Sequence, residues 1–487
     1  MSRKIDLISM EMLPGHGAPV AGGGLRTWSL LETLRAAGHD VRVCLPQALI
    51  DQYGLTQYSA FQPAAMQAFL DASPAEVFVF EQWYPLSLPE RVDRPVVVDL
   101  PGPLLLENYW RRVAATERMA LAKLRALGRA DVWLYATPRQ RYYWLAFMAL
   151  SGHDLAAPAL VHAPIAFPAQ PASGRERDPS RFVYAGVFWP WQDPTPALSA
   201  LVSVLERRGR GTLEIFGGPH PQHEVEGQRY LDPTATLPPG PRVQYRGMLP
   251  FEQLTERLET AGVAVDVVPC NAERELSSTI RTVVYLHCGL PVVVSRHSYL
   301  VEAIAAAGAG WIVDDAPGGL EPVFEAVLND ADEVTRRGDA ARRLAQARFT
   351  CPGAMLEFLA VVDRLEVGRR PEPFTERLDR QVRELEHGLR ERIGQLEATA
   401  AAQAGEIAHL GRLAADREAS LHAARLCRQA LEEAYYIASR DLEALRSSLP
   451  HRLLRALKRL LGKYREPDDY RPRIPEAWSR PPSHTDT

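Results

Sequence analysis

The stretch Glu273 to Ser295 reads ERELSSTIRTVVYLHCGLPVVVS and combines a polar turn, a helix and a buried strand. Three hydroxyl residues form the turn: Ser277, Ser278 and Thr279. Arg281 follows within the first turn of the predicted helix, Gly289 ends that helix, and Pro291 opens a run of valines. Free N–H groups at a helix start, hydroxyls and a guanidinium together favour a bound diphosphate. Taken alone, the turn also fits an ordinary capped helix with an exposed arginine.

Short apolar runs alternate with longer amphipathic segments on both sides of this stretch. The predicted strands are 4–9, 41–45, 76–80, 95–100, 131–136, 182–187, 212–216, 243–246, 263–268, 291–295 and 310–313. Such alternation is typical of parallel sheets with helices on both faces. We therefore predict an α/β fold with two Rossmann-like doubly wound domains, 1–165 and 181–365, joined by a Pro- and Ser-rich linker at 166–180. Two such domains bind a ligand in the cleft at the carboxyl ends of their strands.

A glycine run separates the first predicted strand from a helix over 25–37. The run consists of Gly22, Gly23 and Gly24. Glycines let a backbone approach a ligand closely, and a helix N-terminus favours anions. A tight strand-to-helix turn without a ligand is the alternative. A dinucleotide site is not indicated, because the second strand ends at Pro46 without an acidic residue for a ribose.

Together these two segments resemble the GT-B glycosyltransferases, especially the large retaining group usually numbered family 4. In that group a double glycine precedes a helix that ends in a Gly-His-x-Val turn, as Gly38, His39 and Val41 do here. A Ser- or Glu-rich turn and a cation then face the nucleotide diphosphate, before a Gly-x-Pro-Val-Val strand. The resemblance implies donor binding by these residues: Gly22, Gly23, Gly24, Gly186, Gly217, Ser277, Ser278, Thr279 and Arg281.

Several positions depart from the pattern of this group. Val284 stands where the group has a Glu for the ribose hydroxyls, and a valine side chain accepts no hydrogen bond. Pro101 replaces a His of the acceptor loop, so Asp99 and Glu107 remain as the polar candidates of that loop. The candidate catalytic residues are Arg281, Glu275 and Asp99. The residues after Gly186 lack the usual basic side chains: Trp189, Trp191, Gln192 and Asp193. Trp191 either stacks on a base or sugar ring or belongs to the core.

The resemblance implies transfer of a sugar, of the hexosyl type, from a nucleotide-sugar donor to a glycan or lipid-linked acceptor. It further implies a metal-independent, retaining reaction with no bound cofactor beyond the donor co-substrate. A second hypothesis is a weak or inactive scaffold of the same fold that organises partner enzymes. Val284 and Pro101 favour the scaffold, whereas the polar turn before Arg281 favours the enzyme.

The region 373–449 has a different pattern, with mostly apolar residues spaced alternately by four and three. One extra four-residue step occurs between Leu389 and Ile393, and no proline lies between Pro373 and Pro450. This pattern predicts a coiled coil and hence a homo-oligomer or attached partner enzymes. A monomeric long helix is the alternative.

The C-terminal residues form two further segments. In 451–465, leucines share one helix face and basic residues occupy the rest, which fits an anionic membrane surface or a partner protein. Residues 466–487 are Pro-rich and predicted to be disordered. With the coiled coil, the basic helix indicates assembly at the inner face of the cytoplasmic membrane, as in cell-surface polysaccharide synthesis.

Composition is that of an ordinary soluble protein. The 487 residues are 46% hydrophobic with a formal net charge of −4, which gives no general argument for a nucleic-acid partner. Five cysteines without a CxxC motif indicate neither a disulfide framework nor a zinc site, and fit a reducing cytosol. We expect no signal peptide and no membrane-spanning helix, and therefore a cytoplasmic location.

Overall fold

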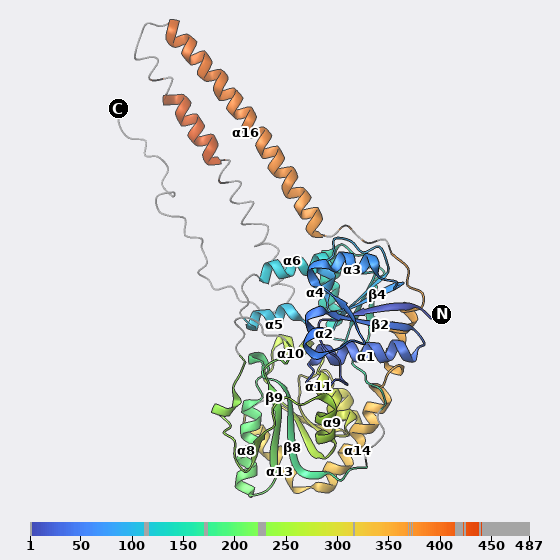
Figure 1. The fold of residues 1–487 in the computed structure, drawn as a ribbon. Coiled ribbons are helices and arrows are strands. Elements are labelled where there is room, and N and C mark those ends of the chain that lie inside the picture. Colours follow the sequence, from blue (N-terminus) through green and yellow to red (C-terminus); the bar gives the residue numbers. More distant parts are fainter. Residues whose placement is uncertain are drawn as a thin grey trace, which may run out of the picture. The chain divides into compact units, whose positions relative to one another are not determined.

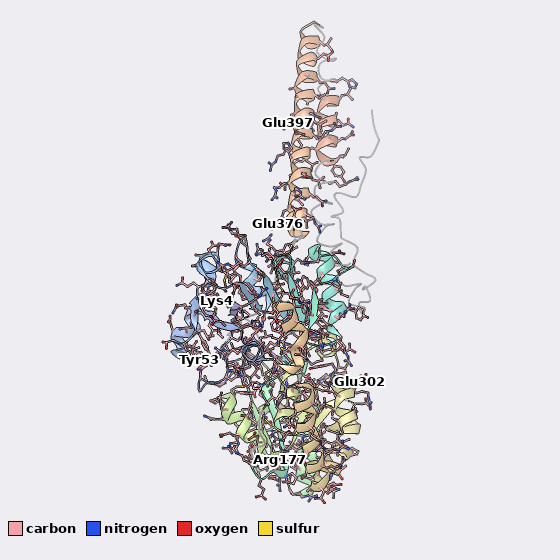
Figure 2. The ribbon with its side chains drawn as sticks, turned by 90° about the vertical axis from the view of Figure 1, so that its right-hand side faces the viewer. Lys4, Tyr53, Arg177, Glu302, Glu376 and Glu397 are labelled. Atoms are coloured by element: carbon pink, nitrogen blue, oxygen red, sulfur yellow. The ribbon has the colours of Figure 1, made fainter. Side chains whose placement is uncertain are left out.

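A computed structural model gives the fold (Figure 1). It describes residues 2–111, 116–169, 174–222, 230–314, 317–368, 370, 372, 374–413, 422, 425–437 and 440. The chain divides into two compact units, Met1–Gln381 and Val382–Thr487. Both predicted Rossmann-like domains lie in the first unit, and Figure 2 labels Lys4 in the first of them and Glu302 in the second.

The N-terminal domain is built on a seven-stranded sheet in the order β3-β2-β1-β4-β5-β6-β7, with every neighbouring pair parallel. Its strands are β1 (Lys4–Ile8), β2 (Asp40–Pro46), β3 (Ser59–Phe61), β4 (Val77–Glu81), β5 (Val96–Leu100), β6 (Val132–Tyr135) and β7 (Leu160–His162). Its helices are α1 (Gly22–Ala36), α2 (Gln47–Tyr53), η1 (Pro63–Ala65), α3 (Met66–Ala72), α4 (Trp83–Ser87), α5 (Leu104–Arg111), α6 (Thr116–Leu127) and α7 (Gln140–Ser151). The five predicted strands are present, and the short strands β3 and β7 extend the sheet at its two edges.

The second domain is built on a six-stranded parallel sheet in the order β10-β9-β8-β11-β12-β13. Its strands are β8 (Asp178–Val187), β9 (Thr212–Gly218), β10 (Val243–Tyr245), β11 (Ala261–Asp266), β12 (Val292–Ser295) and β13 (Gly310–Val313). The helical segments are η2 (Pro190–Gln192), α8 (Thr195–Arg208), η3 (Pro233–Ala235), α9 (Phe251–Glu259), α10 (Ala272–Leu276), α11 (Ile280–His287), α12 (Val301–Ala307), α13 (Pro317–Asn329) and α14 (Ala331–Arg348). All six predicted strands are confirmed.

Apolar strands buried on both faces hold each sheet between helices, as expected of parallel sheets. In the second domain, α8 and α13 cover one face with Leu198, Leu201 and Phe324, while α11 and α14 cover the other with Val283 and Leu344. These helices bury their apolar stripes against the strands and so hold the ends of the strands in place. The loops at the carboxyl ends of the strands carry the candidate site.

Two predicted boundaries differ from the structure. The linker 166–180 is not free of regular structure, because Phe167 pairs with Thr350 and β8 already begins at Asp178. The predicted second domain, 181–365, does not keep its last residues. After η4 (Gly353–Met355), helix α15 (Leu356–Val362) packs into the core of the N-terminal domain. The chain therefore crosses between the domains twice.

Helix α16 (Phe374–Leu413) begins the predicted coiled-coil region and carries Glu376 and Glu397 (Figure 2). Residues 425–437 are also helical. Seam residues Leu385, Ile393 and Leu410 are exposed at 45%, 44% and 56%. This single chain thus leaves part of the predicted seam uncovered, and the coiled coil stays a prediction. The predicted basic helix 451–465 and tail 466–487 lie outside the described residues. No described helix is long and apolar enough to span a membrane.

Candidate functional site

Two adjoining cavities lie at the carboxyl ends of the two sheets. One has a volume of about 320 Å³ and the other about 240 Å³. Both are lined by Ala21, Gly22, Val187, Trp189, Arg274, Ser278 and Ile280. Helices α1 and α11, whose N-termini supply several of these residues, contact each other (Figure 1). The glycine run and the polar turn, although about 250 residues apart, therefore belong to one site, as the sequence predicted for a cleft between the domains.

The two cavities differ in charge. The smaller one, here the basic cavity, is lined by Arg274 and Arg281, and no Asp or Glu lines it in the described part of the chain. The larger one, here the acidic cavity, is lined by four carboxylates, Glu11, Asp99, Glu107 and Glu273, and shares Arg274. Like charges repel most strongly where water is scarce. The basic cavity therefore favours an anionic ligand group, whereas the acidic cavity disfavours one.

Arg281 is fixed at the wall of the basic cavity by neighbours from three elements. Its Nη1 donates to Tyr184 Oη at 2.5 Å, its Nη2 donates to Gln192 Oε1, and its Nε lies 3.9 Å from Asp266 Oδ1. Burial opposes the charge, but the nearby Tyr184 and Asp266 outweigh it and raise the pKa of Arg281. The guanidinium is therefore charged, oriented, and still has N–H groups for an anion.

The polar turn before α11 lies between the two cavities. Ser278 Oγ donates to Pro101 O at 3.0 Å and so joins the two domains, and Ser277 Oγ donates to Arg274 O at 3.4 Å. Thr279 is the N-cap of α11, but its side chain makes no capping hydrogen bond. At 9% exposure, Thr279 Oγ1 has no hydrogen-bond partner within the described residues, although it lines the basic cavity. A buried hydroxyl at a cavity wall can donate a hydrogen bond to a group that enters the cavity.

Arg274 is the cation that the sequence analysis missed. Its Nε and Nη2 bind both carboxylate oxygens of Glu273, at 2.6 and 2.8 Å. Asn271 caps the short helix α10 by accepting from the amides of Glu273 and Arg274, and its Nδ2 donates to Trp191 O at 2.7 Å. The sequence alone gives no reason to choose Arg274 rather than the neighbouring Glu275 as a site residue. Glu275 lines neither cavity, and its backbone oxygen accepts from Arg139 at 3.4 Å.

The two predicted glycines of the second domain serve close packing. A Cβ on Gly186 would lie 2.8 Å from Arg281 Nη1, and this glycine has φ +156°. A Cβ on Gly217 would lie 2.6 Å from Gly186 O, and Gly217 itself lines neither cavity. Gly186 thus makes room for the guanidinium, while Gly217 lets β9 approach β8.

The wall beyond Arg281 in the basic cavity is apolar. Val284, one turn further along α11, lines it together with Phe251, Leu254 and Leu258. Trp191 is 3% exposed and stacks on Trp189 at 5.0 Å between ring centroids, so Trp191 belongs to the core. Trp189 is the tryptophan that lines both cavities. An aromatic and apolar surface of this kind suits a planar ring rather than charged groups.

The glycine run at α1 faces the chain's own carboxylate. Glu11 Oε2 accepts from the amide of Gly24 at 3.0 Å, and a Cβ on Gly23 would lie 2.6 Å from Glu11 Cδ. Across the cleft, His220 Nε2 lies 3.7 Å from Glu11 Oε1. Gly22 lines both cavities, and a Cβ there would lie 3.2 Å from Ile280 Cδ1. The N-terminus of α1 is therefore already occupied by an anionic group, which sequence spacing did not reveal.

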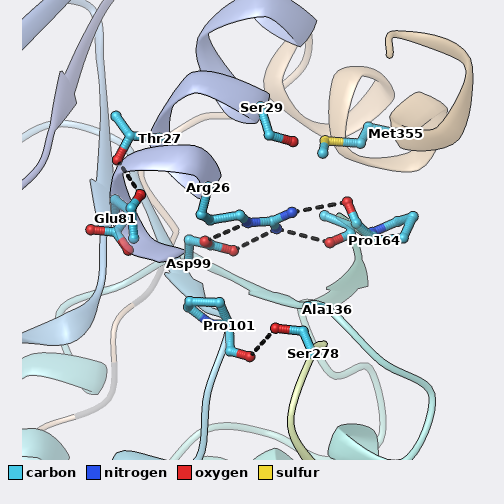
Figure 3. A network of polar contacts seen from close by, with 12 residues as sticks. Arg26, Thr27, Ser29, Glu81, Asp99, Pro101, Ala136, Pro164, Ser278 and Met355 are labelled. Atoms are coloured by element: carbon cyan, nitrogen blue, oxygen red, sulfur yellow. Dashed lines mark hydrogen bonds and ion pairs between the residues drawn. The ribbon is translucent and has the colours of Figure 1, made fainter. Parts of the chain in front are cut away.

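Asp99 is held in a buried ion pair with Arg26 (Figure 3). Arg26 Nε and Nη2 donate to the two carboxylate oxygens at 2.8 Å each, and both side chains are 0% exposed. The same guanidinium donates to Ala163 O and Pro164 O. Asp99, a candidate catalytic residue from the sequence, lines the acidic cavity, but its carboxylate already has a bidentate cation partner.

Glu81 lies next to Asp99 at the end of β4 and is fully buried. The two residues pair across β4 and β5, and Ser9 Oγ donates to Glu81 Oε2 at 3.4 Å. Burial, with the added repulsion of Glu11 and Asp99, raises the pKa of Glu81 well above its ordinary value. Gln82 follows with φ +74°, a strained backbone conformation, and lines the acidic cavity.

No group of three His, Cys, Asp or Glu side chains suited to a metal ion occurs within the described ranges. The groups that the structure brings to the site are carboxylates, guanidinium groups, hydroxyls and indoles. Their chemistry is that of hydrogen bonding, charge stabilisation and proton transfer.

Solved structures share this fold at low sequence identity. Sucrose-phosphate synthase from Thermosynechococcus elongatus is 17% identical, with a TM-score of 0.53 over 74% of this chain and 98% of that one. HepE from Anabaena, solved with UDP and glucose, is 14% identical, with a TM-score of 0.54 over 74% and 100%. WaaG, a glycosyltransferase involved in lipopolysaccharide biosynthesis, is 14% identical, with a TM-score of 0.52 over 75% and 100%. No protein-family model and no curated protein matches the sequence.

Proposed function

On the premise that this chain has the GT-B glycosyltransferase fold, we propose that it transfers a sugar from a nucleotide-sugar donor to a hydroxyl-bearing acceptor. The donor's diphosphate binds in the basic cavity and the acceptor enters the acidic one. The transferred sugar lies where the two cavities meet, beside Gly22, Trp189 and Ser278.

The observation that carries this proposal is the N-terminus of α11. Thr279 Oγ1 is buried and has no hydrogen-bond partner in the part of the chain that the structure describes, and the charged groups of Arg274 and Arg281 line the same cavity. A diphosphate supplies the acceptor oxygens that these donors require, and its charge grows as the bond to the sugar breaks. Of the predicted site residues, Ser278, Thr279 and Arg281 are the ones placed to stabilise that charge directly.

The nucleoside extends along the apolar wall formed by Phe251, Leu254 and Val284. Because Val284 offers no hydrogen bond to a ribose, we expect base contacts and the diphosphate to supply most of the affinity. UDP is the first nucleotide to test, since HepE of the same fold was solved with UDP. A metal-independent, retaining transfer of a hexosyl group belongs to this proposal through the sequence resemblance.

The test is calorimetric titration of the full chain with UDP, GDP, ADP, CMP and dTDP. We expect micromolar binding of one nucleotide, and weaker binding by Arg281→Ala. Arg296→Ala is a matched control, because Arg296 pairs with Asp314 on an exposed surface and lines neither cavity. No binding of any nucleotide would remove the diphosphate site from the account.

A second function, a scaffold without catalysis, is favoured by one observation. Val284 makes the nucleoside side of the basic cavity apolar, where a ribose-binding carboxylate would be expected. The scaffold predicts that the chain binds partner enzymes through 373–449 and binds no nucleotide. The same titration therefore separates the two functions, and an assay of oligomeric state tests the coiled coil in either case.

For the cellular role, we propose cell-surface polysaccharide synthesis at the inner face of the cytoplasmic membrane. The proposal depends on the coiled-coil pattern of 373–449 and the basic helix predicted at 451–465. Flotation of the full chain with vesicles containing anionic lipid, compared with a chain ending at 449, tests the membrane contact. Equal flotation of the two chains would contradict it.

A further inference from the structure

We infer that the acidic cavity takes an uncharged sugar as acceptor and that Glu11 accepts the proton of the attacking hydroxyl. This inference rests on the proposed function and deepens it by naming the acceptor class and the base. It excludes acceptors whose phosphate would enter the cavity. The argument has three parts: the occupied N-terminus of α1, the charge of the lining, and the placement of Glu11.

Glu11 fills the place on the acceptor side where a phosphate would otherwise bind. Helix α1 is 15 residues long, and its first N–H groups are those of the glycine run. Such an N-terminus attracts anions. Here the carboxylate of Glu11 accepts from the amide of Gly24 at 3.0 Å and lies directly against the α-carbon of Gly23. A phosphate would have to displace this carboxylate or lie beside it.

The remaining charge of the lining repels a second anion. Arg274 is the one Lys or Arg that lines this cavity within the described residues, and two nitrogens of its guanidinium donate to the carboxylate of Glu273. Lys123 lies behind the wall, 0% exposed and under Trp83 and Trp144. Carboxylates that accept hydroxyl hydrogens, with indole faces of Trp83 and Trp189, suit a neutral sugar ring.

Glu11 is the carboxylate of this lining that is best placed to accept a proton. The N–H groups at the start of α1 face its carboxylate, and a helix N-terminus favours a negative charge there. Asp99 is bound on both oxygens by Arg26, and Glu273 on both by Arg274. Glu81 is fully buried behind Glu11 and does not line the cavity. His220 faces Glu11 from the second domain, so closure of the cleft completes this group.

The acceptor oxygen forms a bond with the anomeric carbon of the donor sugar from the face that the diphosphate leaves, which keeps the configuration. At the same time its O–H bond breaks, and the proton passes to a carboxylate oxygen of Glu11. The bond between the anomeric carbon and the diphosphate oxygen breaks, and its electron pair stays with the diphosphate. Arg281 and Arg274 then face the added negative charge.

The experiment compares Glu11→Gln with the unchanged full chain. Glutamine keeps the size of the side chain and still accepts from the Gly24 amide, but it takes up no proton at neutral pH. Transfer of the sugar to water is measured for every variant, with the donor of the nucleotide that binds. For Glu11→Gln we expect a loss of about 100-fold or more in kcat and an unchanged nucleotide Kd. For Glu11→Ala we expect added formate to restore part of the lost kcat.

Two controls distinguish this role from others. Glu256→Gln removes an exposed carboxylate of a separate cavity near α9 and should leave kcat unchanged. Glu107→Gln removes the competing carboxylate of the acidic cavity. If Glu11→Gln retains kcat within threefold, or if Glu107→Gln shows the 100-fold loss instead, the assignment of the base is overturned.

The acceptor class is tested with matched pairs of p-nitrophenyl glycosides and their 6-phosphates. We expect transfer to a neutral glycoside and at least tenfold less to its phosphorylated counterpart. Equal or faster transfer to the phosphate would overturn the inference while leaving the donor site intact. Failure of the proposed function has a different signature, since it would appear as absence of nucleotide binding before any acceptor is added.

Discussion

The basic and acidic cavities share seven lining residues yet present opposite charges. The basic cavity is lined by Arg274 of α10 and by Arg281 in the first turn of α11, and Thr279 Oγ1 at that helix start has no hydrogen-bond partner among the described residues. In the acidic cavity, the start of α1 is already occupied by Glu11. The starts of the two helices thus differ in whether a side chain of this protein occupies them. This difference teaches that a helix N-terminus in such a fold is an anion site only when the chain itself leaves it open.

Replacement of Arg26 is expected to have the largest effect, because it removes the ion pair that holds the acidic cavity's floor. Arg26→Ala leaves Asp99 ionised, 0% exposed and without its bidentate partner. We expect a loss of about 3–5 kcal/mol in the free energy of unfolding, measured by urea denaturation. The double variant Arg26→Leu/Asp99→Leu should recover much of this loss. Equal stability of Arg26→Ala and the unchanged chain would contradict the assigned pair.

Replacement of Lys123, behind the acidic cavity, should stabilise the fold. Its Nζ has no hydrogen-bond partner in the described chain and lies 4.4 Å from the ring centroid of Trp144. Burial lowers the pKa of Lys123 from 10.5 to about 7. Lys123→Met keeps the volume and removes the buried charge, so we expect a gain of about 1–4 kcal/mol. A loss of stability would show that the aromatic cluster requires the amine.

The pH dependence of that gain follows from the lowered pKa. Between about pH 7 and pH 10 the unfolded chain keeps the proton on Lys123 while the folded chain releases it. The stability of the unchanged chain relative to Lys123→Met therefore rises with pH across this window, and the gain is largest below pH 7. Denaturation curves of both proteins at pH 6.5, 8 and 9.5 check this, and a gain that is independent of pH would contradict it.

Replacement of Arg281 should weaken the basic cavity alone. Arg281→Ala removes a charge-assisted contact to the donor diphosphate, so we expect about a 10- to 100-fold weaker nucleotide Kd by calorimetry. Arg281→Lys keeps the charge but loses the planar guanidinium that donates to Tyr184 and Gln192. Its nucleotide Kd should lie between that of the unchanged chain and that of Arg281→Ala. A nucleotide Kd unchanged by Arg281→Ala would place the diphosphate elsewhere.

A pair of glycine substitutions separates the two cavities with the smallest expected effects. Gly23→Ala places a Cβ against Glu11, and Gly186→Ala places one against Arg281. Each side chain must shift, at a cost of about 1–3 kcal/mol. We expect Gly23→Ala to lower kcat about tenfold or more without changing the nucleotide Kd, and Gly186→Ala to weaken that Kd. Identical effects of the two substitutions would show that the cavities do not act separately.

Most of the fold was predictable from local sequence patterns. The eleven predicted strands are mostly apolar runs bounded by Gly, Pro or polar turns, and each is present in the parallel sheets. The three-residue edge strands β3 and β7 were missed, whereas β10, also a three-residue edge strand, was predicted. The return of α15 to the N-terminal core was also missed, since its apolar face does not reveal which domain it covers.

The site was predictable where it depends on local order and not where it depends on distant contacts. Thr279 and Arg281, chosen from the helix-start pattern, both line the basic cavity, and their role in donor binding stays a prediction. Glu11 and Arg274 were missed, because their roles arise from α1 and from the meeting of two domains rather than from neighbours in sequence. Asp99 was found at the cavity, but its partner Arg26 is 73 residues away and only the fold brings the two together.

The most direct test of the opposite roles of the two cavities is a crystal structure of the full chain with the nucleotide diphosphate that binds. The account predicts diphosphate oxygens within hydrogen-bond distance of Arg281 and Thr279 in the basic cavity, while Glu11 keeps its contact with Gly24. A diphosphate bound at Gly23 and Gly24, with the Glu11 carboxylate displaced, would contradict it.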